Sequence, residues 1–272
     1  MTTPDNAPTI ASDARVRAEV AEHPFPLLFA TVSGAHLYGF ASPDSDVDLR
    51  GAHVAPVELL TGLDRVEETV KRSHVRETAL GEPVEVDLVT HEVRKFFALL
   101  LRNNGYVLEQ VTSPLVVHTT PEHAELVALA RGCATRTCVR HYLGFAHNQW
   151  QLFDKERPRR VKPLLYVYRV LLTGTHLMRT GEVNANLLAC NDALDAGERL
   201  PYVHELVARK VAGSEHGALG DADVSFHGQE YLRLRARLVD ASERSTLPDA
   251  PTTGEPIRDL LRRIRRAAVV TA

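Results

Sequence analysis

The chain has 272 residues, of which 44% are hydrophobic and 25% are charged, and its formal net charge is −3 at pH 7. This length suits one large domain or two small ones, each with a hydrophobic core. The slightly acidic balance argues against a surface covered in nucleic-acid contacts, while a local basic groove stays compatible with it. The sequence has neither an apolar run long enough to span a membrane nor a signal peptide, so we expect a cytoplasmic protein without a membrane partner.

The three cysteines, Cys133, Cys138 and Cys190, show no Cys-x-x-Cys spacing. An odd number of cysteines without paired spacing favours neither a disulfide framework nor a zinc site. The histidines also lack a chelating spacing. We therefore expect buried, reduced thiols and no histidine metal site.

The N-terminal half is predicted to alternate strands with short helices. Residues 1–12, rich in Thr and Pro, are predicted to form a flexible tail. Short apolar or alternating runs predict strands at Leu27–Val32, Asp46–Val54, Arg65–Lys71 and Val84–Thr90. The apolar stripe of His91–Arg102 predicts a helix that ends near Gly105.

Helical periodicity dominates the chain after about residue 121. It recurs in the segments Glu122–Arg131, Thr135–Phe153, Pro163–Arg179, Tyr202–Val211, Gln229–Ser242 and Glu255–Val270. Ser245–Gly254, rich in Thr and Pro, is predicted to be a mobile linker. Strands followed by helices predict an α+β protein, in which residues 13–115 form a small mixed β-sheet domain and residues 116–272 form an all-helical domain.

Two aspartates stand at the start of the second predicted strand. Asp46 and Asp48 are one residue apart, so in a strand both point to the same face. Adjacent carboxylates repel each other unless a cation neutralises them, and Mg²⁺ or Mn²⁺ prefers such oxygen ligands. The preceding Ser33-Gly34 turn is predicted to lead into a helical turn whose free N–H groups bind an anion. Taken alone, an Asp-x-Asp in a stretch rich in Ser and Pro is more typical of a solvated turn.

A third acid favours a metal site over a solvated turn. Residues Val84–Leu88 alternate between apolar and acidic, which places Glu85 and Asp87 on one face of a strand. If this strand neighbours the strand of Asp46 and Asp48, three carboxylates together hold two divalent ions. Glu85 is the alternative to Asp87 as the third ligand.

This arrangement resembles the nucleotidyltransferase superfamily that includes DNA polymerase beta. The signature of that superfamily is a Gly-Ser turn, a spacer, an Asp-x-Asp and a third Asp on a later strand. The segment Ser45–Gly51 is similar, more narrowly, to a bacterial subfamily of predicted nucleotidyltransferases, some of them associated with RNA repair. The later signature of that subfamily, Asn-x-x-x-Leu-Glu, is matched by Asn104–Glu109. Ala35 departs from the superfamily pattern, which usually has Ser after the Gly, and here Ser33 precedes the Gly instead.

The resemblance implies a palm-like catalytic domain and a helical domain that closes the active-site cleft. It implies that Asp46, Asp48 and Asp87 are the catalytic residues and the ligands of two Mg²⁺ or Mn²⁺ ions. It also implies that an NTP binds with its triphosphate at the turn formed by Ser33, Gly34, Ala35 and His36.

The helix predicted from Pro163 carries a second, non-acidic stripe beside its apolar face. The members of this stripe recur at helical spacing and are Lys162, Tyr166, Arg169, Thr173 and His176. A solvated helix face explains two or three of these residues equally well. Helical domains of two-domain nucleotidyltransferases often supply cations to the triphosphate. The resemblance therefore makes Lys162 a point charge and Arg169 a two-pronged donor for phosphate oxygens.

The sequence thus predicts a metal-dependent nucleotidyltransferase that moves an NMP from an NTP to a hydroxyl acceptor and releases pyrophosphate. The acceptor stays open, because an RNA end, a small hydroxylated molecule such as an aminoglycoside, and a protein side chain all present a hydroxyl. A non-catalytic nucleotide-binding regulator and a structural partner of RNA-processing enzymes stay open as well. Three clustered acids disfavour the regulator, since binding alone has little need of them.

Overall fold

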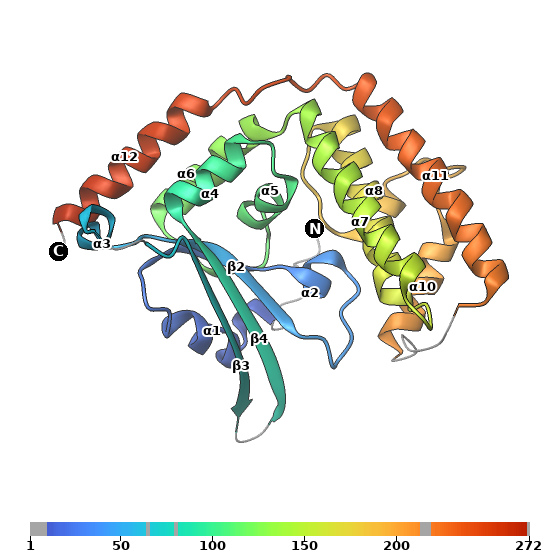
Figure 1. The fold of residues 1–272 in the computed structure, drawn as a ribbon, viewed down its shortest axis with the longest axis horizontal. Helices are drawn as coiled ribbons and strands as arrows, with labels where there is room; N and C mark the ends of the chain where they lie inside the picture. The colour runs from blue at the N-terminus through green and yellow to red at the C-terminus, as the bar shows by residue number, and fades with distance from the viewer. Residues whose placement is uncertain (1–9, 64–65, 79–80, 213–218, 271–272) are drawn as a thin grey trace, which may run out of the picture.

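The computed structural model describes residues 10–63, 66–78, 81–212 and 219–270. Its strands form a five-stranded sheet in the order β3-β4-β2-β1-β5, of which β3, β4 and β2 are labelled in Figure 1. The strands are β1 (Leu27–Val32), β2 (Val47–His53), β3 (Thr69–Thr78), β4 (Gly81–Glu92) and β5 (Val116–His118). β2 and β4 run parallel, whereas the other neighbouring strands are antiparallel. The predicted α+β class with a mixed sheet is confirmed.

The helices divide into a set around the sheet and a bundle beside it (Figure 1). The first set comprises α1 (Ala14–Ala21), α2 (Gly34–Tyr38), α3 (Val57–Thr61), α4 (Val93–Leu101), α5 (Gly105–Val111) and α6 (Pro121–Ala130). The later helices are α7 (Val139–Lys155), α8 (Val161–Thr180), α9 (Leu187–Asp192), α10 (Pro201–Val211), α11 (Asp221–Glu243) and α12 (Gly254–Val270). Within the described ranges, no helix is both long and apolar enough to cross a membrane.

The structure departs from the predicted boundaries at three places. Residues 1–9 of the predicted tail lie outside the described residues, but Ile10–Ser12 form a 3-10 turn and Ala11 is buried in a core. The sheet continues past residue 115, because β5 pairs with β1. The predicted mobile linker is hydrogen-bonded to the body, for example from the Thr252 N–H to the Gly132 carbonyl at 2.9 Å.

The last helix also returns to the sheet end of the molecule rather than staying with the bundle. α12 packs against α3, α4 and α6 (Figure 1). Arg265 of α12 pairs there with Glu92, the last residue of β4. Of the later helices, α12 therefore lies against the helices around the sheet, whereas α7 to α11 lie in the bundle beside it.

α1 covers one face of the sheet. Val16 and Val20 of α1 belong to a core with the apolar residues of β2 and β4, namely Val47, Leu49, Val86 and Leu88. Because side chains alternate along a strand, the residues between these apolar positions point to the opposite face. This alternation directs Asp48 and Asp87 away from α1.

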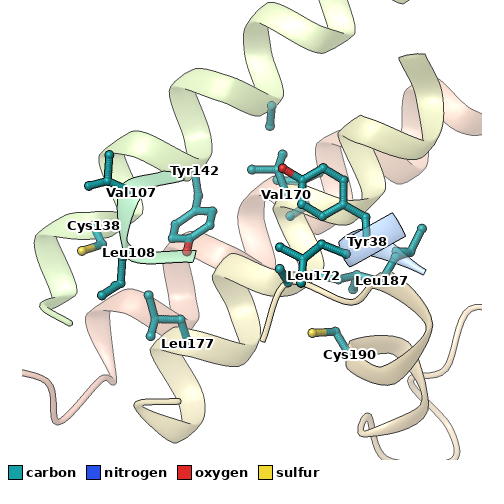
Figure 2. Close-up of a cluster of buried hydrophobic side chains, with 14 of the residues drawn as sticks. Tyr38, Val107, Leu108, Cys138, Tyr142, Val170, Leu172, Leu177, Leu187 and Cys190 are labelled. Carbon is teal, nitrogen blue, oxygen red and sulfur yellow. The ribbon is translucent and has the colours of Figure 1, made fainter. Parts of the chain in front are cut away.

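A second core joins the opposite face of the sheet to the helical bundle. Figure 2 shows Tyr38 of α2 and Val107 and Leu108 of α5 among side chains from α7, α8 and α9. Cys138 and Cys190 lie in this core, and Cys133 is buried there too. All three cysteines are free, as predicted.

An ion cluster holds α1 against β3. The side chain of Glu19 is fully buried and is bound by Arg72 at 2.7 Å, by His74 at 3.0 Å and by Arg76. Burial raises the pKa of Glu19, but the hydrogen bonds from Arg76, Arg72 and His74 lower it overall. The cluster therefore fixes the ribbon of β3 and β4 on its α1 side and favours the ionised form of Glu19.

Replacing Glu19 by Gln should lower the free energy of unfolding by about 2 kcal/mol at pH 7, because the partly buried Arg72 and Arg76 lose the charge of their buried partner. The folded-state pKa of Glu19 lies below that of the unfolded chain, so its contribution is present above the unfolded pKa and is lost as the pH falls through the folded pKa. Urea unfolding of both proteins should therefore converge below about pH 4. Glu22→Gln, which removes the exposed partner of the same arginines, is the control and should cost much less. Equal losses for the two variants would contradict the assignment.

Candidate active site

β2 and β4 bring two of the predicted acids together. In the parallel pair, Asp48 lies directly beside Asp87. Both side chains are partly buried, and each stands between two fully buried apolar residues of its own strand. The register thus creates a pair of carboxylates on the face of the sheet that α1 leaves uncovered.

The other two acids stand one residue before the stretch in which β2 and β4 pair. Val47 pairs with Val86, and Asp46 and Glu85 immediately precede these residues. Both acids are exposed. The Glu85 carboxylate accepts a hydrogen bond from the Ser73 hydroxyl of β3 at 3.4 Å. The register therefore pairs Asp48 with Asp87 and leaves Glu85 on the ribbon of β3 and β4.

Arg50 is a site residue that the motif alone did not reveal. Its Nη2 donates to Asp48 Oδ1 at 2.6 Å, and its Nε donates to the Tyr106 hydroxyl at 3.0 Å. Its Nη1 donates to the carbonyls of Leu49 and Asp87 at 2.8 and 2.9 Å. The available signal was the spacing, because a residue two positions after Asp48 shares its strand face. Arg50 neutralises one oxygen of Asp48 and connects the two strands that carry the acids.

The Ser33-Gly34 turn lies against Asp48. The Ser33 N–H donates to the Asp48 carbonyl at 2.8 Å. Gly34 has a φ of +60°, and a Cβ at this position would lie 2.0 Å from Asp48 Oδ2. Both the backbone conformation and the close approach therefore require glycine. The following Ala35 is buried in the hydrophobic core, which accounts for an apolar side chain where the superfamily pattern has Ser.

His36 lies between this turn and the loop before β2. Burial lowers the pKa of its imidazole, opposed by a hydrogen bond to the backbone of Ser45, and the charges of Lys210 on one side and Asp48 and Asp46 on the other contribute less. Its Nε2 is buried and has no hydrogen-bond partner among the described residues. His36 also lines a cavity of 540 Å³ between α2, the end of α5 and the end of α8.

The N-terminal part of α8 lies near the acids. Lys162 stands in its first turn, and its positive charge contributes to lowering the pKa of Asp44, after a hydrogen bond from Ser42 as the main cause. Burial, followed by the negative charge of Asp48, raises the pKa of Tyr166 to about 12. Lys162 and Tyr166 are both only partly buried.

Arg169, two turns further along α8, does not follow the predicted arrangement. Its side chain is only 2% exposed, and its Nη1 donates to Glu109 Oε2 at 2.5 Å. Its guanidinium stacks over the ring of Tyr38, 4.0 Å from the centroid. Contrary to the expectation from the helix stripe, Arg169 is an ion-pair partner in the core and does not present its charge to a triphosphate.

The acids of the site offer a divalent cation two paired carboxylates. Within the part of the chain that the structure describes, no three His, Cys, Asp or Glu side chains are grouped closely enough to hold a metal ion. Asp48 and Asp87 nevertheless form a pair in register, and their oxygen chemistry suits Mg²⁺ or Mn²⁺. The residues present therefore fit a two-carboxylate site, with the exposed Asp46 just outside it.

One family model matches most of the chain. Residues 10–263 match the family described as RlaP, the RNA repair pathway DNA polymerase beta family. The uncharacterized protein MJ0002 of Methanocaldococcus jannaschii is 30% identical over 185 residues, which are 67% of this chain and 73% of that protein. The uncharacterized protein YcgL of Bacillus subtilis is 24% identical over 195 residues, 70% of this chain and 71% of that protein. The crystal structure of a nucleotidyltransferase-like protein from Exiguobacterium sibiricum aligns with 92% of this chain and 78% of that one, at 14% identity and a TM-score of 0.31.

Gly34→Ala should lower the free energy of unfolding by about 2 kcal/mol, because it combines a left-handed backbone with an overlap on Asp48. In a double-mutant cycle, Asp48→Ala should recover part of this loss, since it removes the overlap but not the backbone strain. Gly144→Ala is the control: that glycine lies on an exposed helix position with nothing within 4 Å of a Cβ, and the change should raise stability by about 0.5 kcal/mol. Additive effects of Gly34→Ala and Asp48→Ala in urea unfolding would contradict the close approach.

Proposed function

Because the chain belongs to the RNA repair pathway DNA polymerase beta family, RlaP, we propose that it is a metal-dependent nucleotidyltransferase. It moves an NMP from an NTP to a hydroxyl group at an RNA end and releases pyrophosphate. The observation that carries this proposal is the register of β2 and β4, which sets Asp48 beside Asp87 while the Ser33-Gly34 turn abuts Asp48. A phosphate-binding turn next to paired carboxylates is the arrangement that nucleotidyl transfer needs.

Asp48 and Asp87 would hold Mg²⁺ or Mn²⁺, and the exposed Asp46, just before β2, would complete the ligand set. When bound, two such ions neutralise phosphate oxygens and lower the pKa of an attacking hydroxyl. Arg50 keeps Asp48 in place through its hydrogen bond to Oδ1. Asp87 is preferred to Glu85 as the third ligand because it shares the register of Asp48 and is the shorter side chain.

In the proposed reaction, the acceptor hydroxyl oxygen attacks the α-phosphorus in line, and the bond from that phosphorus to the pyrophosphate oxygen breaks. The hydroxyl proton passes to Asp87, which lies on the strand face shared with Asp48. Backbone N–H groups of residues 34–36 and the ammonium of Lys162 stabilise the negative charge on the leaving pyrophosphate. The turn acts through its backbone, which Ser33, Gly34, Ala35 and His36 provide. The side chain of Ala35 is buried, so this residue offers only its N–H group to a phosphate.

The proposed acceptor is an RNA end, for which the support is the description of the family. The direct test incubates the protein with each α-labelled NTP, Mg²⁺ or Mn²⁺, and an RNA oligonucleotide with a free 3′ hydroxyl. The same oligonucleotide with a 3′-deoxy end is the control. Label on the free-hydroxyl RNA alone supports the proposal, and equal label on both oligonucleotides, or none, contradicts it.

Asp48→Asn and Asp87→Asn should each lower kcat by about a thousandfold, because each removes a charged metal ligand. Glu85→Gln is the matched control on the same strand face, and its kcat should stay within about threefold of wild type. Steady-state rates with labelled NTP at saturating Mg²⁺ give the comparison. A larger loss for Glu85→Gln than for Asp87→Asn would exchange their roles.

Lys162→Met should weaken NTP binding by about tenfold, since it removes a positive charge from the phosphate side of the site. Lys155→Met, at the exposed end of α7, is the control and should leave the affinity unchanged. Calorimetry with Mg²⁺ and a non-hydrolysable NTP analogue measures both. The assignment of Lys162 fails if both variants bind the analogue like wild type or if both lose affinity equally.

A further inference from the structure

A short segment, Tyr38–Ser45, follows the Ser33-Gly34 turn and leads to β2. Several helices of the bundle contact this segment. Tyr38 lies under the guanidinium of Arg169 from α8. At Gly39, where φ is +84°, the side chain of Asn186 approaches so closely that a Cβ would lie 2.6 Å from its Nδ2. Asn186 is the N-cap of α9. Residues of α8 and of the start of α9 therefore constrain the backbone between the Ser33-Gly34 turn and β2.

Further along the segment Tyr38–Ser45, Phe40 contacts α8, and Ser42 and Ser45 contact α10. The ring of Phe40 meets that of Tyr166 edge to face, with centroids 5.6 Å apart. Lys210 of α10 then reaches the loop with its ammonium group. Its Nζ donates to the Ser42 hydroxyl and to the Ser45 hydroxyl, the latter at 2.7 Å.

Lys210 is buried in a site built around two serines. It is only 2% exposed. The hydroxyls of Ser42 and Ser45 are 3.0 Å apart, the Ser42 N–H donates to the Ser45 hydroxyl at 2.9 Å, and the Ser45 N–H donates to the Ser42 carbonyl at 2.9 Å. Removing an ammonium from water is costly unless its hydrogen bonds are satisfied, so the loop cannot leave Lys210 without a large penalty.

We infer that Lys210 is a positioning residue for Asp46, an inference that rests on the proposed function, in which Asp46 is a metal ligand. Asp46 is itself exposed, so its own contacts with the core do not fix it. Its place is set by its two neighbours, Val47 in the sheet and Ser45 on Lys210. Lys210 thereby transmits the position of α10 to the outer acid of the site, and its ammonium serves the loop and does not bind the triphosphate.

The physical part of the inference is tested by hydrogen exchange of the whole protein. Lys210→Met should speed exchange of the backbone amides in residues 42–48 by about tenfold and leave other segments unchanged. Lys95→Met is the matched control, because Lys95 also donates its Nζ to a hydroxyl, that of Thr69, at 2.6 Å and away from the loop. Ser45→Ala is a milder variant that keeps the lysine and should act in the same direction. Unchanged exchange in residues 42–48 for both loop variants would overturn the inference.

The functional part is tested by metal dependence. Lys210→Met should raise the Mn²⁺ concentration for half-maximal activity by about fivefold or more while the NTP KM stays within about twofold. In the Asp46→Asn background, the same change should cost nothing further. A raised NTP KM with unchanged metal dependence would make Lys210 a phosphate contact and overturn the inference, as would independent effects of the two substitutions. An inactive wild type would refute the proposed function, whereas hydrogen exchange and calorimetric Mn²⁺ titration of Lys210→Met would still decide on Lys210.

Discussion

The buried ion pair between Glu109 of α5 and Arg169 of α8 is the constraint on which the joining of sheet and bundle depends. The two side chains are 3% and 2% exposed, and removing an isolated charge from water costs several kcal/mol. Burial alone would lower the pKa of Arg169, but Glu109 raises it overall, so the arginine is charged. The Tyr142 hydroxyl donates to Glu109 at 3.4 Å, and the ring of Tyr38 faces the guanidinium. Four helices, α2, α5, α7 and α8, therefore meet at one pair of charges, which α5 and α8 supply.

This ion pair also governs the candidate active site, because α2 is short. The helix begins at Gly34, against the carboxylate of Asp48, and ends at Tyr38, under Arg169. Because α2 is little more than one helical turn long, a displacement of the bundle at Tyr38 would also displace Gly34, which contacts Asp48. The bundle is thus part of the frame of the site, and its charge at Arg169 serves assembly. Lys162 stands two turns before Arg169 in the same stripe, and its charge contributes to lowering the pKa of Asp44 in the loop before β2, after a hydrogen bond from Ser42 as the main cause.

The sequence was most informative where a local pattern decides the structure. β1 has the predicted bounds, and strand alternation correctly separated Asp48 and Asp87 from the apolar face. It was insufficient where the outcome depends on distant segments. The stripe of Lys162 and Arg169 is real, but a 20-residue helix is about 30 Å long, so its members meet different surroundings. The contact of Lys210 with the loop spans 165 residues of chain and leaves no local signal.

Arg50 explains how the carboxylate pair is stable in the protein alone. Two carboxylates in register repel each other unless a positive charge is near. Arg50 supplies that charge on Asp48 Oδ1, while Oδ2 faces Gly34. A cation held by the two acids would share or replace this role. The guanidinium would not be left without partners, because it keeps its hydrogen bonds to the Tyr106 hydroxyl and to the carbonyls of Leu49 and Asp87. The strand that carries Asp48 thus also carries the group that neutralises it.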